Sequence, residues 1–204
     1  MIAIIDYGLG NIKAFANIYK ELNVRFTIAA KKEDLSTATK IILPGVGAFD
    51  HAMEQLKKSG MRETLDELVV QRKLPVLGIC VGMQILALSS DEGRLSGLGW
   101  IDGVVKKFKI TDLIHKTRFP HMGWNSVNPI PNTKLFKGLD IESRFYFLHS
   151  YYFQCHDKNN IIATSNYGNK FTCAVNLENI YGVQFHPEKS HQNGIRVLKN
   201  FSNL

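Results

Sequence analysis

The apolar residues of this chain follow two alternating patterns in its first half. Short apolar runs predict buried strands at residues 2–6, 24–29, 40–43 and 75–79. Between them, apolar residues recur at helical spacing over residues 11–22, 49–58 and 62–71. Strands that alternate with helices are typical of a parallel sheet with helices on its faces. We therefore predict an α/β fold with an open, mostly parallel central sheet.

The pattern changes after Gly93. Aromatic and β-branched runs between turn residues predict further strands at 104–108, 144–148, 161–165, 171–176 and 180–185. Apolar residues at helical spacing over 193–201 predict a final helix that packs back on the sheet. Neither an internal repeat nor a linker interrupts the pattern. We expect one domain, residues 1–204, with a β-rich C-terminal half.

The composition is that of an ordinary globular protein. Of the 204 residues, 45% are hydrophobic and 21% are charged. The N-terminal apolar run is shorter than a signal peptide requires, and no run reaches the roughly 18 residues that span a bilayer. We expect a cytoplasmic protein with no role at a membrane. The net charge of +7 comes from dispersed basic residues without an aromatic platform, which argues against a nucleic-acid partner.

The cysteines and two of the histidines are spaced unlike metal ligands. Cys80, Cys155 and Cys173 are an odd number at intervals that fit neither a disulfide framework nor a zinc site. His121 and His149 lie in strand-like contexts without a metal-ligating neighbour, so we expect packing or hydrogen bonding for them. We predict reduced thiols and no metal site.

One cysteine occupies a position typical of a nucleophile. Residues 78–82, Gly-Ile-Cys-Val-Gly, follow an apolar run and precede a helix-like stretch at 83–88. A strand, a tight turn and a helix with Cys80 at the apex match the nucleophile elbow of hydrolases, with sulfur in place of oxygen. The start of a helix favours a thiolate through the helix dipole. The alternative is a buried cysteine that acts as a small hydrophobe.

A second motif supplies a base and an acid. Residues 182–188 place His186 at the end of a short strand, with Glu188 two residues later. Side chains at i and i+2 of an extended chain point the same way, so the imidazole and the carboxylate can address one spot. His186 would activate Cys80, and Glu188 would orient the imidazole. Alone, such a motif is more often a core histidine beside a surface charge.

A glycine loop at residues 43–49 is the third element. Attack on an amide carbonyl creates an oxyanion, which backbone N–H groups in such a loop can bind. We predict that the N–H groups of Gly47 and Val81 form this oxyanion hole; an ordinary strand-to-helix turn is the alternative. The loop lacks the Lys-Ser/Thr ending of a phosphate loop, and residues 7–11 lack the third glycine of a dinucleotide fingerprint. We expect no cofactor.

With these residues in place, the whole chain resembles the class I (triad) glutamine amidotransferases, and within them the glutaminase subunits of imidazole glycerol phosphate synthases. The motifs that carry the resemblance are Asp6-Tyr7-Gly8-Leu9-Gly10-Asn11, Pro44-Gly45-Val46-Gly47-Ala48-Phe49, Gly78-Ile79-Cys80-Val81-Gly82-Met83-Gln84, Pro120-His121-Met122-Gly123-Trp124-Asn125, Tyr146-Phe147-Leu148-His149-Ser150-Tyr151 and Gly182-Val183-Gln184-Phe185-His186-Pro187-Glu188-Lys189-Ser190.

The resemblance implies a substrate, a product and a partner. Cys80 would attack the side-chain amide of L-glutamine, with Gln84, Ser150 and Tyr151 holding the amino-acid end of the substrate. The ammonia would pass into a (β/α)8 cyclase subunit that forms imidazole glycerol phosphate and aminoimidazole carboxamide ribotide in histidine biosynthesis. The two subunits would form a heterodimer. The resemblance places four residues near that interface: Asn11, Trp124, Tyr146 and Lys189.

Two alternatives remain open from the sequence. The same glutaminase chemistry could supply ammonia to a sugar-modifying amidotransferase of surface polysaccharide biosynthesis. A non-catalytic binding module that merely retains the fold is the other alternative. The intact set of Cys80, His186 and Glu188 disfavours the second of these.

Overall fold

The computed structural model of the chain describes residues 1–109, 119–140 and 142–204. The strands of the first half are β1 (Ile2–Ile5), β2 (Phe26–Ala29), β3 (Lys40–Gly45), β4 (Val76–Cys80) and β5 (Ser89–Ser90). Those of the second half are β6 (Gly103–Lys107), β7 (His121–Ser126), β8 (Asn128–Pro129), β9 (Arg144–His149), β10 (Tyr151–Cys155), β11 (Ile161–Tyr167), β12 (Asn169–Leu177) and β13 (Ile180–Val183).

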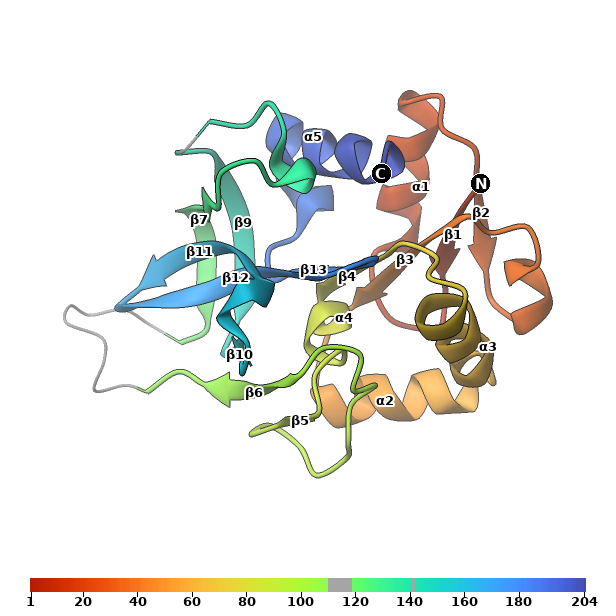
Figure 1. Cartoon of the computed structure of the whole chain (residues 1–204), viewed down its shortest axis with the longest axis horizontal. Coiled ribbons are helices and arrows are strands. Elements are labelled where there is room, and N and C mark those ends of the chain that lie inside the picture. Colours follow the sequence, from red (N-terminus) through yellow and green to blue (C-terminus); the bar gives the residue numbers. More distant parts are fainter. Residues whose placement is uncertain (110–118, 141) are drawn as a thin grey trace.

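Helices connect the strands mainly in the first half. They are α1 (Ile12–Glu21), α2 (Phe49–Lys58), α3 (Arg62–Asp66), α4 (Val81–Gln84) and α5 (His191–Ser202). α3 continues into a π-helical turn at Glu67–Gln71. Figure 1 shows α1 and α5 on one face of the central sheet and α2, α3 and α4 on the other. This three-layer arrangement buries β1 and β4 completely, because both of their faces are covered.

The central sheet is mixed. Its strand order is β2-β1-β3-β4-β13-β12-β10-β6-β5, and β11 pairs with β12 and β8. The pairs from β2 to β13 are parallel, whereas β12 and β10 run antiparallel to their neighbours. β7 and β9 form a separate antiparallel pair. The predicted α/β fold with a β-rich C-terminal half is confirmed.

The register of the central strands positions the candidate site. β4 lies between β3 and β13, both parallel to it, and Gly45 is directly opposite Cys80. Val183, the last residue of β13, is opposite Ile79. The carboxyl ends of these three strands therefore meet at one edge of the sheet, where α/β proteins bind their ligands. The glycine loop, Cys80 and the His186 motif lie at the ends of β3, β4 and β13, in that order.

The predicted helix at residues 83–88 is wrong. α4 is a single turn that ends at Gln84. The carbonyls of Ile85, Leu86 and Ala87 accept hydrogen bonds from the N–H groups of Leu98, Ile101 and Gly99, at 2.7, 3.1 and 3.1 Å, instead of continuing the helix. Because residues 85–87 are completely buried, apolar periodicity could not distinguish a helix from this buried loop.

Candidate active site

Cys80 sits at a strained backbone position between two glycines. Its φ of 56° and ψ of −111° lie outside the regions that most residues adopt. A Cβ at Gly78 would approach the Gly82 carbonyl oxygen to 2.5 Å, and one at Gly82 would collide with the Leu43 carbonyl. The glycines thus let the strand turn sharply into α4 and place Cys80 at the apex of the turn, as in a nucleophile elbow.

Replacement of Gly82 with alanine is expected to lower the free energy of unfolding by about 2–3 kcal/mol, because the added methyl group collides with the backbone of β3. Gly60→Ala is a matched control, since nothing lies within 4 Å of a Cβ there and only its φ of 67° opposes alanine, at a cost of about 1 kcal/mol. Urea unfolding of both variants measures the difference. Equal losses would show that the elbow is not tightly packed against β3.

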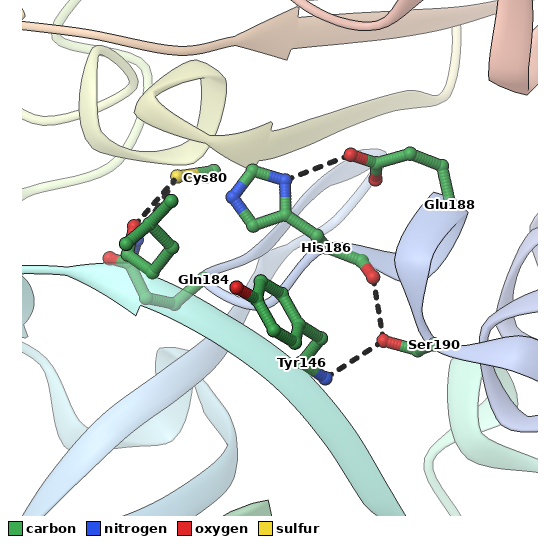
Figure 2. A network of polar contacts seen from close by, with 7 residues as sticks. Cys80, Tyr146, Gln184, His186, Glu188 and Ser190 are labelled. Carbon is green, nitrogen blue, oxygen red and sulfur yellow. Dashed lines mark hydrogen bonds and ion pairs between the residues drawn. The ribbon is translucent and has the colours of Figure 1, made fainter. Parts of the chain in front are cut away.

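His186 and Glu188 form a buried pair beside the sulfur. The imidazole Nδ1 lies 2.9 Å from Glu188 Oε1, and the two side chains are only 4% and 3% exposed. Glu188 Oε2 has no hydrogen-bond partner among the described residues. The carboxylate therefore depends on the imidazole for its charge compensation. Figure 2 shows Cys80 on the opposite side of the ring from this carboxylate.

The pair is held by a turn and not by an extended strand, so the predicted i, i+2 geometry is wrong. β13 ends at Val183, and Pro187–Lys189 form a 3-10 turn. The Ser190 hydroxyl donates to the His186 carbonyl at 2.6 Å and accepts from the Tyr146 N–H at 3.0 Å. The His186 N–H donates to the Tyr146 carbonyl at 2.8 Å. Proline favours this turn, and β9 fixes it in place (Figure 2).

The surroundings of His186 favour its charged form. Burial alone would lower the pKa of this imidazole, but the neighbouring Cys80 sulfur and then Glu188 raise it to about 10. A sulfur and a carboxylate on either side of one ring stabilise an imidazolium. The favoured form of His186 in this site is therefore the imidazolium.

The Cys80 sulfur has two further polar neighbours. The Gln184 side-chain amide donates toward Sγ across 3.8 Å (Figure 2), and the Leu148 carbonyl oxygen lies 3.9 Å from Sγ. Gln184 is completely buried. The sulfur therefore has both a donor and an acceptor within reach.

A pocket of about 290 Å³ opens onto the sulfur and the imidazole. Its lining residues are Val46, Gly47, Cys80, Val81, Gln84, Glu92, Pro120, Leu148, His149, Ser150, Tyr151, His186 and Lys189. The predicted nucleophile, base, oxyanion-hole residues and substrate-binding residues all border this one cavity. Its volume suits a small polar molecule of amino-acid size.

Two pocket residues can receive a cationic group. Both N–H groups of the Gln84 amide are already used, one by the Tyr151 carbonyl at 3.1 Å and one by Gln184 Oε1 at 3.0 Å. Gln84 therefore offers only its oxygen as an acceptor. Glu92 adds a carboxylate, whose Oε2 accepts from the Phe49 N–H at 2.9 Å. An ammonium group is the natural ligand for this end of the pocket.

The central part of the glycine loop, residues 45–48, is anchored at both ends. The buried Tyr7 hydroxyl donates to the Pro44 carbonyl at 2.7 Å, and Glu92 holds the Phe49 N–H. Between them, Gly47 has a φ of 91°, which favours glycine. Val81 opens α4, where the first N–H groups have no acceptor within the helix. The loop and the helix start thus both bring backbone to the cavity that holds the sulfur.

Three of the four predicted interface residues lie close together. Trp124 and Tyr146 are opposite each other in the β7–β9 pair with ring centroids 6.2 Å apart, and the Lys189 ammonium lies 5.6 Å from the Tyr146 centroid. Asn11 is exposed just before α1, which contacts the turn that carries Lys189. Met122, 64% exposed, belongs to the same face and was not predicted.

Sequence reasoning missed functional candidates that the fold brings to the site. Glu92 lies in a loop whose sequence shows no apolar pattern. Its position 12 residues after Cys80 was the one signal that the sequence offered for it. Gln184 precedes His186 by two residues within a motif already singled out. His121 and His149 are hydrogen-bonded to each other, with His121 Nδ1 2.9 Å from His149 Nε2. Hydrogen bonding was one of the two roles expected for these histidines.

The described residues include no group of three histidine, cysteine or acidic side chains that could hold a metal ion. Within the same part of the chain, every helix falls short of the length and apolar character needed to cross a membrane.

Comparison with known proteins places the chain in a family. The family model described as glutamine amidotransferase class-I matches residues 3–203. The chain belongs to the class I glutamine amidotransferases. The predicted resemblance is thereby confirmed, and the chain is an enzyme of this family.

Relatives and solved structures agree with this placement. The chain is 58% identical to the imidazole glycerol phosphate synthase subunit HisH of Bdellovibrio bacteriovorus and 55% identical to that of Leptospira interrogans, in both cases over 204 residues that cover 100% of each chain. A crystal structure of a glutamine amidotransferase covers 100% of both chains with a TM-score of 0.76 and 17% identity. PurLQS from Thermotoga maritima gives a TM-score of 0.72 at 16% identity, over 99% of this chain and 97% of the other. The relatives assign the amidotransferase to the HisH type, and the solved structures share its fold.

Proposed function

We propose that this amidotransferase hydrolyses L-glutamine to glutamate and ammonia through a cysteinyl thioester, and delivers the ammonia to a HisF-like cyclase subunit with a (β/α)8 fold. The observation that carries the proposal is the arrangement of Cys80 and His186 at one pocket, with Glu188 hydrogen-bonded to the imidazole. A sulfur, an imidazole bound to a buried carboxylate, and a cavity of amino-acid size are the parts that amide hydrolysis by a nucleophile requires.

The first half of the reaction would form the thioester. The Cys80 thiolate attacks the side-chain carbonyl carbon of glutamine, and the N–H groups of Gly47 and Val81 stabilise the resulting oxyanion. His186 then gives its proton to the leaving nitrogen, the carbon–nitrogen bond breaks and ammonia departs. Glu188 stabilises the imidazolium before this transfer and holds its Nδ1 proton afterwards.

The second half would release glutamate. His186, now neutral, takes a proton from a water molecule that attacks the thioester carbon. The carbon–sulfur bond breaks, and the resting pair of thiolate and imidazolium returns. The sum is glutamine plus water giving glutamate plus ammonia. No metal or cofactor enters the scheme.

The substrate would be oriented by its amino-acid end. The α-ammonium group would contact Gln84 Oε1 and the Glu92 carboxylate, whereas the α-carboxylate would be bound near the backbone of Ser150 and Tyr151. The ammonium and carboxylate groups at the amino-acid end distinguish glutamine from a simple amide. This recognition also aligns the side-chain carbonyl with the sulfur.

An exposed apolar face beside the pocket supports a protein partner. Met122 and Trp124 of β7 and Tyr146 and Leu148 of β9 alternate with residues that are less exposed, so they lie on one face of this strand pair. Leu148 also lines the pocket. A cyclase docked there, with Asn11 and Lys189 at its margin, would receive ammonia without release into water, where most of it would become unreactive ammonium.

The names of the relatives favour histidine biosynthesis as the destination of the ammonia. No observation favours the polysaccharide alternative. Co-purification decides between them, since a (β/α)8 cyclase that stimulates ammonia release supports the proposal, and a sugar-modifying synthase that does so contradicts it.

A glutamine-mimicking electrophile is expected to label Cys80 once a cyclase subunit and its nucleotide ligand are bound, because that sulfur borders the pocket. Burial, and to a lesser extent Asp157, raises the pKa of Cys155 to about 12, and burial also raises the pKa of Cys173, so both remain unreactive thiols. Peptide mass spectrometry identifies the labelled residue. Labelling of Cys155 or Cys173 in place of Cys80 would overturn the assignment.

A further inference from the structure

A chain of buried polar side chains runs behind the pocket to the Cys80 sulfur. Its centre is the backbone carbonyl of Tyr151, which accepts from His149 Nδ1 at 2.7 Å and from Gln84 Nε2 at 3.1 Å. From Gln84 the chain continues through Gln184 to Sγ. Gln84, His149 and Gln184 are 3%, 6% and 0% exposed, so water does not compete for these bonds.

The Tyr151 carbonyl fixes the orientation of both glutamine amides. A carbonyl oxygen accepts hydrogen bonds and never donates them, so Gln84 must turn its nitrogen toward it. The second N–H of that nitrogen then requires an acceptor, and Gln184 supplies its oxygen. With its oxygen engaged, Gln184 must turn its own nitrogen toward the sulfur. Reversal of the Gln84 amide would bring oxygens face to face, and reversal of the Gln184 amide alone would set two N–H donors against each other in a buried site.

We propose that Gln184 is a further catalytic residue, which donates a hydrogen bond to the Cys80 thiolate, and that the Tyr151 carbonyl fixes this donation through Gln84. The proposal rests on the proposed function, in which Cys80 is the nucleophile. The Leu148 carbonyl 3.9 Å from the sulfur favours the thiol, because it can accept from S–H but repels a thiolate. An amide donor at 3.8 Å offsets that repulsion.

Two histidines hold the other side of the Tyr151 carbonyl. Because His149 donates from Nδ1, its Nε2 must accept the 2.9 Å bond from His121 Nδ1. His121 Nε2 then accepts from Asn125 Nδ2 at 3.1 Å. Burial lowers the pKa of His121 to about 4 and, with the nearby His121, that of His149 to about 3. Both rings stay neutral near pH 7, which keeps the direction of the chain constant.

The test is the rate at which iodoacetamide alkylates Cys80 at pH 7.5 in the full chain, with the cyclase subunit and its nucleotide ligand bound. Gln184→Leu removes the donor, and the rate is expected to fall about tenfold, as a hydrogen bond to a charged group implies. Gln184→Glu keeps an acceptor for Gln84 but presents an oxygen and a negative charge to the sulfur. The alkylation rate of this variant is therefore expected to fall further than that of Gln184→Leu. Gln154→Leu, at an exposed position of β10, is the matched control and should keep the wild-type rate.

The other two cysteines report on folding in the same experiment. Cys155 and Cys173 are buried, so label appears on them only when a variant unfolds. If Gln184→Leu unfolds the chain, the rate measured for Gln184→Glu decides whether Gln184 assists Cys80, because glutamate has nearly the same shape as glutamine. Wild-type Cys80 no more reactive than in the urea-unfolded chain would contradict the proposed function. Reactive wild-type Cys80 with unchanged rates in both Gln184 variants would overturn the role of Gln184 alone.

Discussion

Replacement of Cys80 with alanine is expected to lower glutamine-dependent ammonia release by about ten-thousandfold or more, because no thioester can form without the sulfur. The small side chain also fits the elbow, so the fold should survive. Steady-state release of glutamate and ammonia, measured with the cyclase partner and its nucleotide ligand present, gives the effect. Cys155→Ala is the matched control, since Cys155 lies in β10 outside the pocket and should leave the rate unchanged.

The same variant separates ammonia production from ammonia use. When ammonium salts replace glutamine, the complex that contains Cys80→Ala should form product at the wild-type rate, because the partner performs that step. Loss of both activities would show that this subunit contributes more than ammonia. Full glutamine-dependent activity in the variant would remove Cys80 from the mechanism.

Glu188→Gln is expected to reduce kcat by about a thousandfold to ten-thousandfold while KM changes little. An amide can bind the imidazole in the wrong tautomer, and it cannot stabilise the imidazolium. KM should be preserved because Glu188 does not line the pocket. Glu178→Gln, whose carboxylate forms an exposed ion pair with Lys73, is the matched control. A large increase in KM with unchanged kcat would mean that Glu188 binds substrate.

This variant also tests the pH dependence of stability. The pKa of His186 is raised to about 10 in the folded chain from an ordinary value of 6.5, so the folded state holds its proton more tightly than the unfolded state. The stabilisation is therefore fully present below about pH 6.5 and lost as the pH rises through about 10. Glu188→Gln should lose stability at pH 6 and much less at pH 10.5 in urea unfolding. An equal loss at both pH values would contradict a charged His186.

The sequence predicted the parts of the site that depend on backbone chemistry. A Cβ at Gly78 would meet the backbone of α4 and one at Gly82 would meet the backbone of β3, and the sequence indicated both glycines through the sharp turn expected between a strand and a helix. Parallel strands whose carboxyl ends meet then bring the glycine loop, Cys80 and His186 to one edge. The contact of His186 with Glu188 was predicted through the wrong local geometry, since a 3-10 turn achieves it.

Contacts between residues distant in sequence could not be predicted in this way. Gln84 and Gln184 are 100 residues apart, and their amides meet only because β13 lies beside β4. The hydrogen bond of His121 to His149 likewise requires the pairing of β7 with β9. The end of α4 at Gln84 depends on N–H donors within residues 98–101, which bind the carbonyls of residues 85–87 and which periodicity does not report.

The positive φ at Cys80 creates a trade-off between the stability of the fold and the reactivity of the site. Glycine would occupy this conformation without the roughly 1–3 kcal/mol that a side chain costs there. Selection for thermal stability alone would therefore favour glycine in place of Cys80. Directed evolution that screens only for heat tolerance should accumulate stable variants that lack the nucleophile.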